Sequence, residues 1–213
     1  MTLLKDFDKS YRDSVRTTFD QLEKSYTAIA NGYQFDLTKK EVTEAILERL
    51  KNYCLTQNLT KNFLNKRYQA PLADYFVETV LFFLRLYLKS QDRHLEAHSE
   101  RQIKRTRNAI RPDISVWYGN EVVAIIECKT QLGWNRNGWE QDYISREQKL
   151  KEEFPKANSF LLAMTENNWG GFNNHSLLNS RFFSLLDNDT WISNYSHSGQ
   201  ILTPIELLFQ QIK

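Results

Sequence analysis

Residues 113–129 read DISVWYGNEVVAIIECK, and this stretch decides the fold of the chain. Its first six residues alternate between the two faces of a strand, and Gly119-Asn120 is a turn signal that joins antiparallel strands. The following strand, Glu121 to Lys129, contains the continuously apolar run Val122 to Ile126. Such a run is typical of a central strand that is covered on both faces. The stretch therefore predicts a hairpin whose second strand lies inside a sheet.

Two acids and a lysine stand at the ends of these strands. Because side chains alternate along a strand, Glu127 and Lys129 lie on one face and Cys128 lies on the other. Glu127 and Asp113 offer the oxygen ligands that Mg²⁺ prefers. Lys129 is suited to holding the attacking water or to stabilising the charge on a scissile phosphate. Burying such charges without partners costs several kcal/mol, so a metal-dependent phosphodiester hydrolase is the economical explanation.

The register of the hairpin provides a test. A regular two-residue turn at Gly119-Asn120 places Asp113 opposite Ile126 and leaves Glu127 on the other face. A three-residue loop, or a bulge that adds one residue, places Asp113 opposite Glu127. We predict the loop or the bulge, because only these bring the two carboxylates together.

Amphipathic and apolar patterns predict helices around the hairpin. Apolar residues recur at helical spacing from Lys9 to Ala30, and Thr38 with Glu41 is a capping-box signal for a second helix. These two helices pack on each other or on a second subunit; the pattern leaves both open. The other expected elements are a buried helix at 71–89, a strand near 94–100, a helix at 140–154, a buried strand at 158–165, a short helical run near 177–186 and a helix opening at Pro204. This order predicts an α/β (α+β) fold.

Glu78 lies within the apolar helix at 71–89, where an acid needs a positive partner. Arg85, two turns further on, is one candidate partner. A role for Glu78 as a third acid of the metal site is the other interpretation.

Several residues near the hairpin are suited to DNA. A basic cluster precedes Asp113, and a loop follows the second strand with groups that hydrogen-bond or stack on bases. Most basic runs are simply solvated, and Asn and Gly are common in turns, so each segment also has an explanation without DNA. The same is true of the Asn- and Gly-rich loop at 167–174. The candidate nucleic-acid-binding residues are Arg101, Lys104, Arg105, Arg107, Arg111, Trp134, Asn135, Arg136 and Asn137, with Trp139 next to them.

Composition restricts the class of protein. The 213 residues are 41% hydrophobic and 25% charged, which suits one main core, and the net charge is only +2. The chain has two widely separated cysteines and no signal-peptide pattern, and no apolar stretch is long enough to cross a membrane. We expect a cytoplasmic protein without membrane contact. The absence of a glycine-rich phosphate loop predicts that no nucleotide cofactor is used.

Pro112-Asp113, followed by Glu127-Cys128-Lys129, resembles the PD-(D/E)XK nuclease superfamily, also called restriction-endonuclease-like. The resemblance covers roughly residues 72–165. It implies a mixed central sheet of about four or five strands flanked by helices, Asp113 and Glu127 as Mg²⁺ ligands with Mn²⁺ as a substitute, and Lys129 as the residue that assists the water. Glu78 occupies a plausible place for the additional glutamate of many members.

We expect a helical N-terminal region at 1–70, packed on the core or forming its dimer interface, and a nuclease core at 71–213 with C-terminal loops and a helix. The resemblance itself does not extend to the N-terminal helices. It implies a Mg²⁺-dependent DNA endonuclease of the type II restriction kind, acting on duplex DNA as a homodimer. A structure-specific repair or junction nuclease, and a non-catalytic nucleic-acid-binding module, are the alternatives. Gln141 is followed four residues later by Ser145, which departs from the Gln-x-x-x-Tyr pattern of RecB-like exonucleases and favours an endonuclease.

Overall fold

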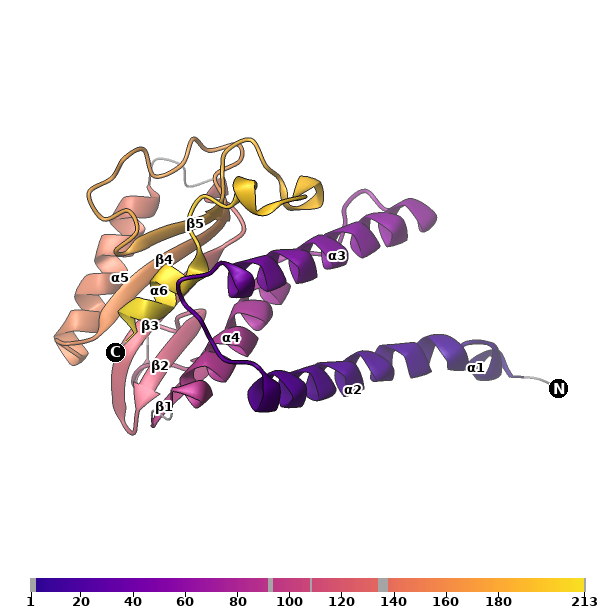
Figure 1. The fold of residues 1–213 in the computed structure, drawn as a ribbon, viewed down its shortest axis with the longest axis horizontal. Helices are drawn as coiled ribbons and strands as arrows, with labels where there is room; N and C mark the ends of the chain where they lie inside the picture. The colour runs from indigo at the N-terminus through magenta and orange to yellow at the C-terminus, as the bar shows by residue number, and fades with distance from the viewer. Residues whose placement is uncertain (1–2, 92–93, 108, 134–137, 213) are drawn as a thin grey trace.

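A five-stranded mixed sheet forms the centre of the computed structural model, which describes residues 3–91, 94–107, 109–133 and 138–212 (Figure 1). The strand order in space follows the chain, and the first three strands pair antiparallel while the third, fourth and fifth are parallel. The strands are β1 (Leu95–Ser99), β2 (Ile114–Tyr118), β3 (Glu121–Lys129), β4 (Asn158–Thr165) and β5 (Phe182–Leu186). The chain therefore has the expected α/β class.

Helices cover both faces of the sheet (Figure 1). The main core joins α3, α4 and α6 to one face, and α5, the crossover between the parallel strands β3 and β4, packs on the other. The helices are α1 (Leu4–Phe7), α2 (Lys9–Gly32), α3 (Glu41–Phe63), α4 (Ala73–Ser90), α5 (Trp139–Glu153) and α6 (Ile205–Gln211), with short 3₁₀ turns η2 (Ile192–Asn194) and η3 (Ser198–Gln200). Within the described ranges, none of these helices is long and apolar enough to span a bilayer.

The short helical run predicted near 177–186 is wrong. Residues 182–186 form β5, all five of whose residues are buried. The sequence FFSLL is a short apolar run, and periodicity does not distinguish a buried strand from a buried helix at that length. Parallel pairing with β4 decides the matter, because it satisfies the backbone of this segment inside the core.

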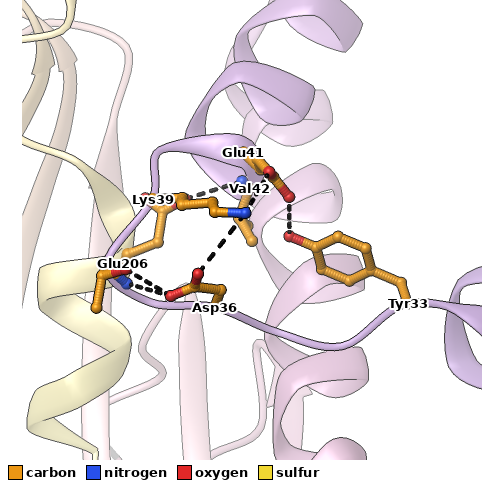
Figure 2. A network of polar contacts seen from close by, with 7 residues as sticks. Tyr33, Asp36, Lys39, Glu41, Val42 and Glu206 are labelled. Atoms are coloured by element: carbon orange, nitrogen blue, oxygen red, sulfur yellow. Dashed lines mark hydrogen bonds and ion pairs between the residues drawn. The ribbon is translucent and has the colours of Figure 1, made fainter.

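The predicted capping box at the start of α3 is also wrong. The Thr38 hydroxyl and backbone N–H both donate to Asp36 Oδ1, at 2.6 and 3.0 Å. Lys40 holds the N-cap position without a side-chain bond. Glu206 of α6 performs the capping instead. Its Oε1 accepts from the backbone N–H of Val42 at 2.8 Å (Figure 2) and from that of Thr43 at 3.1 Å.

This capping is reciprocal. The Thr43 hydroxyl donates to Glu206 Oε2 and accepts from the backbone N–H of Ile205 at 2.8 Å, so each helix supplies a group to the N-terminus of the other. Glu206 and Thr43 are fully buried. The ion pairs drawn near Glu206 in Figure 2, between Lys39 and the acids Asp36 and Glu41, are exposed and contribute little to stability. The buried pair therefore fastens the N-terminal helices to the C-terminal one.

We expect Glu206→Ala to lower the free energy of unfolding by about 2–4 kcal/mol, because it leaves buried donors on α3 without acceptors. Urea denaturation followed by circular dichroism measures this. Glu48→Ala, which removes an exposed acid from α3, is the control and is expected to change stability by less than about 0.5 kcal/mol. Equal losses in the two variants would contradict a structural role for the buried carboxylate.

Candidate active site

The β2–β3 hairpin contains the predicted bulge. Its turn is the two-residue Gly119-Asn120, because Tyr118 pairs with Glu121, and Gly119 has a φ of +58°. Beyond Trp117, which pairs with Val122, the register shifts, and Val116 pairs with Ala124. Val123 is thus an extra residue on β3. Ile114 consequently pairs with Ile126, and one further step sets Asp113 opposite Glu127.

The bulge sorts the side chains of β3 between two environments. Ala124, Ile126 and Cys128 belong to the main core formed with α3 and α4. Ile125 packs on the α5 side of the sheet, and alternation places Glu127 and Lys129 on that same side. The main core therefore holds the strand from one face while the other presents its charged end.

Asp113, Glu127 and Lys129 meet at this end. Lys129 Nζ lies 3.7 Å from Asp113 Oδ2 and 3.8 Å from Glu127 Oε2. Asp113 Oδ2 also accepts a hydrogen bond of 2.7 Å from the backbone N–H of Cys128, which fixes the carboxylate against β3. Lys129 thus contacts both of the carboxylates with which the sequence groups it.

Glu127 is the most constrained of the three. Only 6% of its side chain is exposed, and Oε1 accepts a 2.5 Å hydrogen bond from the Arg146 guanidinium. Burial raises the pKa of this carboxyl group, and the neighbouring Asp113 raises it further. Arg146 and Lys129 act in the opposite direction without cancelling the increase. The surroundings of Glu127 therefore do not fully compensate the charge of its ionised form.

Helix α5 supplies functional groups that the motif analysis missed. Arg146, Lys149 and Asp142 line a hollow of about 450 Å³ together with Glu127 and Lys129. In the sequence they recur at spacings of four and three residues, which places them on one side of the helix that follows the motif. The sequence does not show that this side faces Glu127, because that depends on how α5 packs between β3 and β4.

Tyr143 also lines the hollow but has a structural role. Its hydroxyl donates to the carbonyl of Ser159 at 2.8 Å, which anchors α5 on β4. Burial and the nearby Glu147 raise the pKa of Tyr143 to about 12, so the phenol stays protonated at neutral pH.

Glu78 lies elsewhere. It is exposed, contrary to the expected burial, and lines a hollow with Arg49 and residues of α2. Arg85, the candidate partner, donates instead to the carbonyl of Ala97 at 2.9 Å. In the part of the chain that the structure describes, no three residues among His, Cys, Asp and Glu gather as a metal-binding group, so Glu78 does not join Asp113 and Glu127.

The basic cluster divides into two parts. Arg101 stacks over the Trp117 ring at 3.9 Å, and Lys104 forms an ion pair with Glu153. These two side chains hold the loop against the sheet and α5. Arg105, Arg107 and Arg111 are exposed in the segment that leads to Asp113.

The candidate DNA-binding residues in the loop after β3 are separate from the basic cluster. Trp134, Asn135, Arg136 and Asn137 lie outside the described residues. Trp139 is partly buried and packs edge-on against Phe172 and Phe182, with ring centroids 5.2 and 5.1 Å away. These contacts place Trp139 in an aromatic cluster at the start of α5.

The donor set at the strand end fits a hard cation. Asp113 and Glu127 supply two carboxylates, and Mg²⁺ commonly binds proteins through one or two carboxylates while keeping several waters. A structural zinc site needs four nitrogen or sulfur ligands, which the pair does not provide. The arrangement can hold Mg²⁺ and present Lys129 beside it.

Comparisons with known proteins give no relative: no family model, curated protein or solved structure matches the chain. Function therefore has to be inferred from the arrangement of Asp113, Glu127 and Lys129 itself.

The raised pKa of Glu127 has a consequence for stability. A carboxyl group with a raised folded-state pKa stabilises the protein at pH values below its unfolded pKa of about 4.3 and loses that contribution as pH rises through the folded value. We expect the wild type to lose stability relative to Glu127→Gln as the pH rises above about 4. Urea denaturation at a series of pH values, without metal, measures the difference.

Glu121→Gln, at the exposed start of the same strand, controls for the loss of one negative charge. A difference between wild type and Glu127→Gln that stays constant with pH would refute the electrostatic account of the site.

Proposed function

We propose that the protein is a Mg²⁺-dependent endonuclease that hydrolyses phosphodiester bonds in DNA, most specifically a type II restriction-like enzyme that cuts duplex at defined sequences. The observation that carries this proposal is the contact of two carboxylates and a lysine at the end of a buried strand. Only Glu127 of the three is buried, and a buried carboxylate costs several kcal/mol unless its charge is compensated. A role in chemistry accounts for an acid at this position.

The roles follow from the geometry. Asp113 and Glu127 would hold the metal, which lowers the pKa of bound water and polarises the phosphate. Lys129, between the two acids, donates hydrogen bonds that orient the attacking water or neutralise charge on the phosphoryl oxygens. The water oxygen forms a bond to phosphorus and the bond to the leaving oxygen breaks. A solvent molecule takes the proton released by the water, and the leaving oxygen takes up a proton from another solvent molecule.

The resemblance to the PD-(D/E)XK superfamily supports this assignment. The residues that carry it, Asp113, Glu127 and Lys129, are the ones in contact. A hairpin followed by a crossover helix and a parallel strand agrees with the order implied for a restriction-endonuclease-like core. We assign that core to residues 71–213 as part of the proposal.

Basic side chains near the site suit a phosphate backbone. The exposed Arg111 lies two residues before Asp113, and Lys149 lines the hollow from α5. Contacts of this type position DNA without reading its sequence. They serve a duplex substrate and a branched one equally, so cleavage products have to distinguish the restriction enzyme from the junction nuclease.

Incubation with supercoiled and linear duplex DNA and Mg²⁺ tests the activity. We expect discrete fragments that EDTA abolishes, and a loss of at least about a hundredfold in rate for Asp113→Asn, Glu127→Gln and Lys129→Ala, because each removes a group aimed at the transition-state charge. Glu121→Gln, at the opposite end of β3, is expected to cut like the wild type.

The form of the products separates the alternatives. Cleavage of four-way or flap substrates alone would replace the restriction assignment with a structure-specific nuclease. Salt-sensitive DNA binding without cleavage of any substrate would favour the non-catalytic module. Cleavage that persists in all three site variants would overturn the proposal.

Arg146 gives a second prediction. It occupies Glu127 Oε1, so a cation that binds this oxygen has to displace it. We expect Arg146→Ala to bind Mn²⁺ up to about tenfold more tightly than the wild type, equivalent to about 1.4 kcal/mol. Isothermal titration calorimetry without DNA measures this, with Lys149→Ala as the control for lost charge. Weaker Mn²⁺ binding by Arg146→Ala would mean that Arg146 holds Glu127 in its ligating position.

A further inference from the structure

A second hollow, of about 480 Å³, lies between α2, α3 and α4 and shares no lining residue with the hollow beside Glu127. Its volume is typical of a site for a small molecule. Helix α2 packs on α4 at its C-terminal end, where the Tyr26 and Phe82 rings meet edge-on at 5.5 Å, and it projects beyond the sheet at its other end (Figure 1). We call this space the α2–α4 hollow.

Arg49 of α3 lies where the three helices meet. Its guanidinium lies over the Phe82 ring at 4.0 Å and near the Phe83 ring at 4.9 Å, and both rings belong to α4. Its Nη2 donates to the hydroxyl of Ser25 on α2 at 3.2 Å. A guanidinium has five N–H donors, and the bond to Ser25 uses one of them. These contacts hold Arg49 in place and leave donors for a ligand.

The positive charge of Arg49 is only partly compensated. Burial lowers the pKa of its guanidinium, and Tyr75 and Glu78 act in the opposite direction without cancelling the decrease. Within the described residues, no acid forms an ion pair with Arg49. Residues 49–70 contain five Lys or Arg residues and no Asp or Glu. An anion that enters the α2–α4 hollow is therefore stabilised by the local field.

The wall opposite Arg49 is apolar. Val15, Phe19 and Leu22 line the hollow and recur at spacings of four and three residues on α2. Val15 and Phe19 are 58% and 63% exposed, and Tyr11, which continues the same face, is 71% exposed. At 1.5 Å per residue this face is about 16 Å long. An extended alkyl chain would cover it, whereas the fold leaves it open.

We propose that the α2–α4 hollow binds an apolar monocarboxylate of the fatty-acid class, with its carboxylate on Arg49 and its alkyl chain along Val15 and Phe19. The planar fork of an arginine matches the two oxygens of a carboxylate. Glu78 lines the same hollow and repels a head group with a second negative charge, which favours a monoanion. The inference goes beyond the proposed nuclease activity and does not depend on it.

Other anionic partners fit the hollow less well. A nucleic acid offers phosphates but no alkyl chain for the apolar wall, and its interfaces are strongly polar. The surface of a bilayer is flat, whereas Arg49 is partly buried at the junction of three helices. An acidic amphipathic helix of another protein carries both an acid and an apolar face. Binding of a free carboxylate separates the proposal from that alternative.

Isothermal titration calorimetry with sodium dodecanoate, below its critical micelle concentration, tests the proposal on the full chain without metal or DNA. We expect one dodecanoate to bind per chain. Decanoate is expected to bind about three- to tenfold more weakly, because it buries two fewer methylene groups. Dodecyltrimethylammonium, which has the same chain and the opposite charge, is expected to bind at least about tenfold more weakly than dodecanoate.

Two pairs of variants test the two walls. Arg49→Met is expected to bind dodecanoate at least about tenfold more weakly, because it removes the charged donor. Lys51→Met, which removes the same charge two residues along α3, is expected to stay within about twofold of the wild type. Phe19→Ser is expected to lose about fivefold in affinity, and Phe63→Ser, which removes a ring that is 88% exposed at the end of α3, is the control.

Circular dichroism and urea denaturation show whether each variant is folded. Phe19 lies outside the main core, so Phe19→Ser tests the site even if Arg49→Met is unstable. Absence of binding by the folded wild type, binding that folded Arg49→Met or Phe19→Ser retains in full, or equal binding of dodecyltrimethylammonium would overturn the proposal. Sedimentation with phosphatidylglycerol vesicles without binding of free dodecanoate would also overturn it, in favour of a membrane surface. None of these results bears on DNA cleavage.

Discussion

The β-bulge at Val123 determines whether this chain has a site at all. If Val123 were paired in a regular hairpin, Asp113 would lie opposite Ile126, and the two carboxylates would lie on opposite faces of the sheet. Because Val123 bulges out of the ladder, they share a face, and Lys129 contacts both. The bulge also keeps Ala124, Ile126 and Cys128 in the main core, so the arrangement of the charges and the packing of the strand depend on the same shift in register.

The fold was predictable where the pattern is local. Periodicity located α2, α4 and α5, and the hairpin with its bulge followed from the requirement that the two acids meet. The start of α3 was not predictable, because its capping group, Glu206, lies 164 residues from Val42 in the chain. The prediction for β5 was wrong for a related reason, because a five-residue apolar run takes its conformation from the neighbouring strand.

The site was predictable to the same extent. Asp113, Glu127 and Lys129 belong to one hairpin, and strand alternation relates them directly. Arg146 lies on a helix whose position depends on the crossover to β4, so its contact with Glu127 cannot be read from spacing alone. Glu78 shows the converse error. An acid within an apolar helix was taken as buried, whereas it lies on the side of α4 that neighbouring helices leave open.

The two members of the Glu127–Arg146 pair differ in freedom, and this difference suits the proposed chemistry. Glu127 is 6% exposed and belongs to a strand held by the main core on its other face. The Arg146 side chain is 41% exposed at the surface of α5. An arginine in this position can move into solvent or towards a phosphate at little cost, while the acid cannot follow it. The proposed exchange of the arginine for a cation would therefore leave the geometry of the carboxylates unchanged, which is the preorganisation that a catalytic site requires.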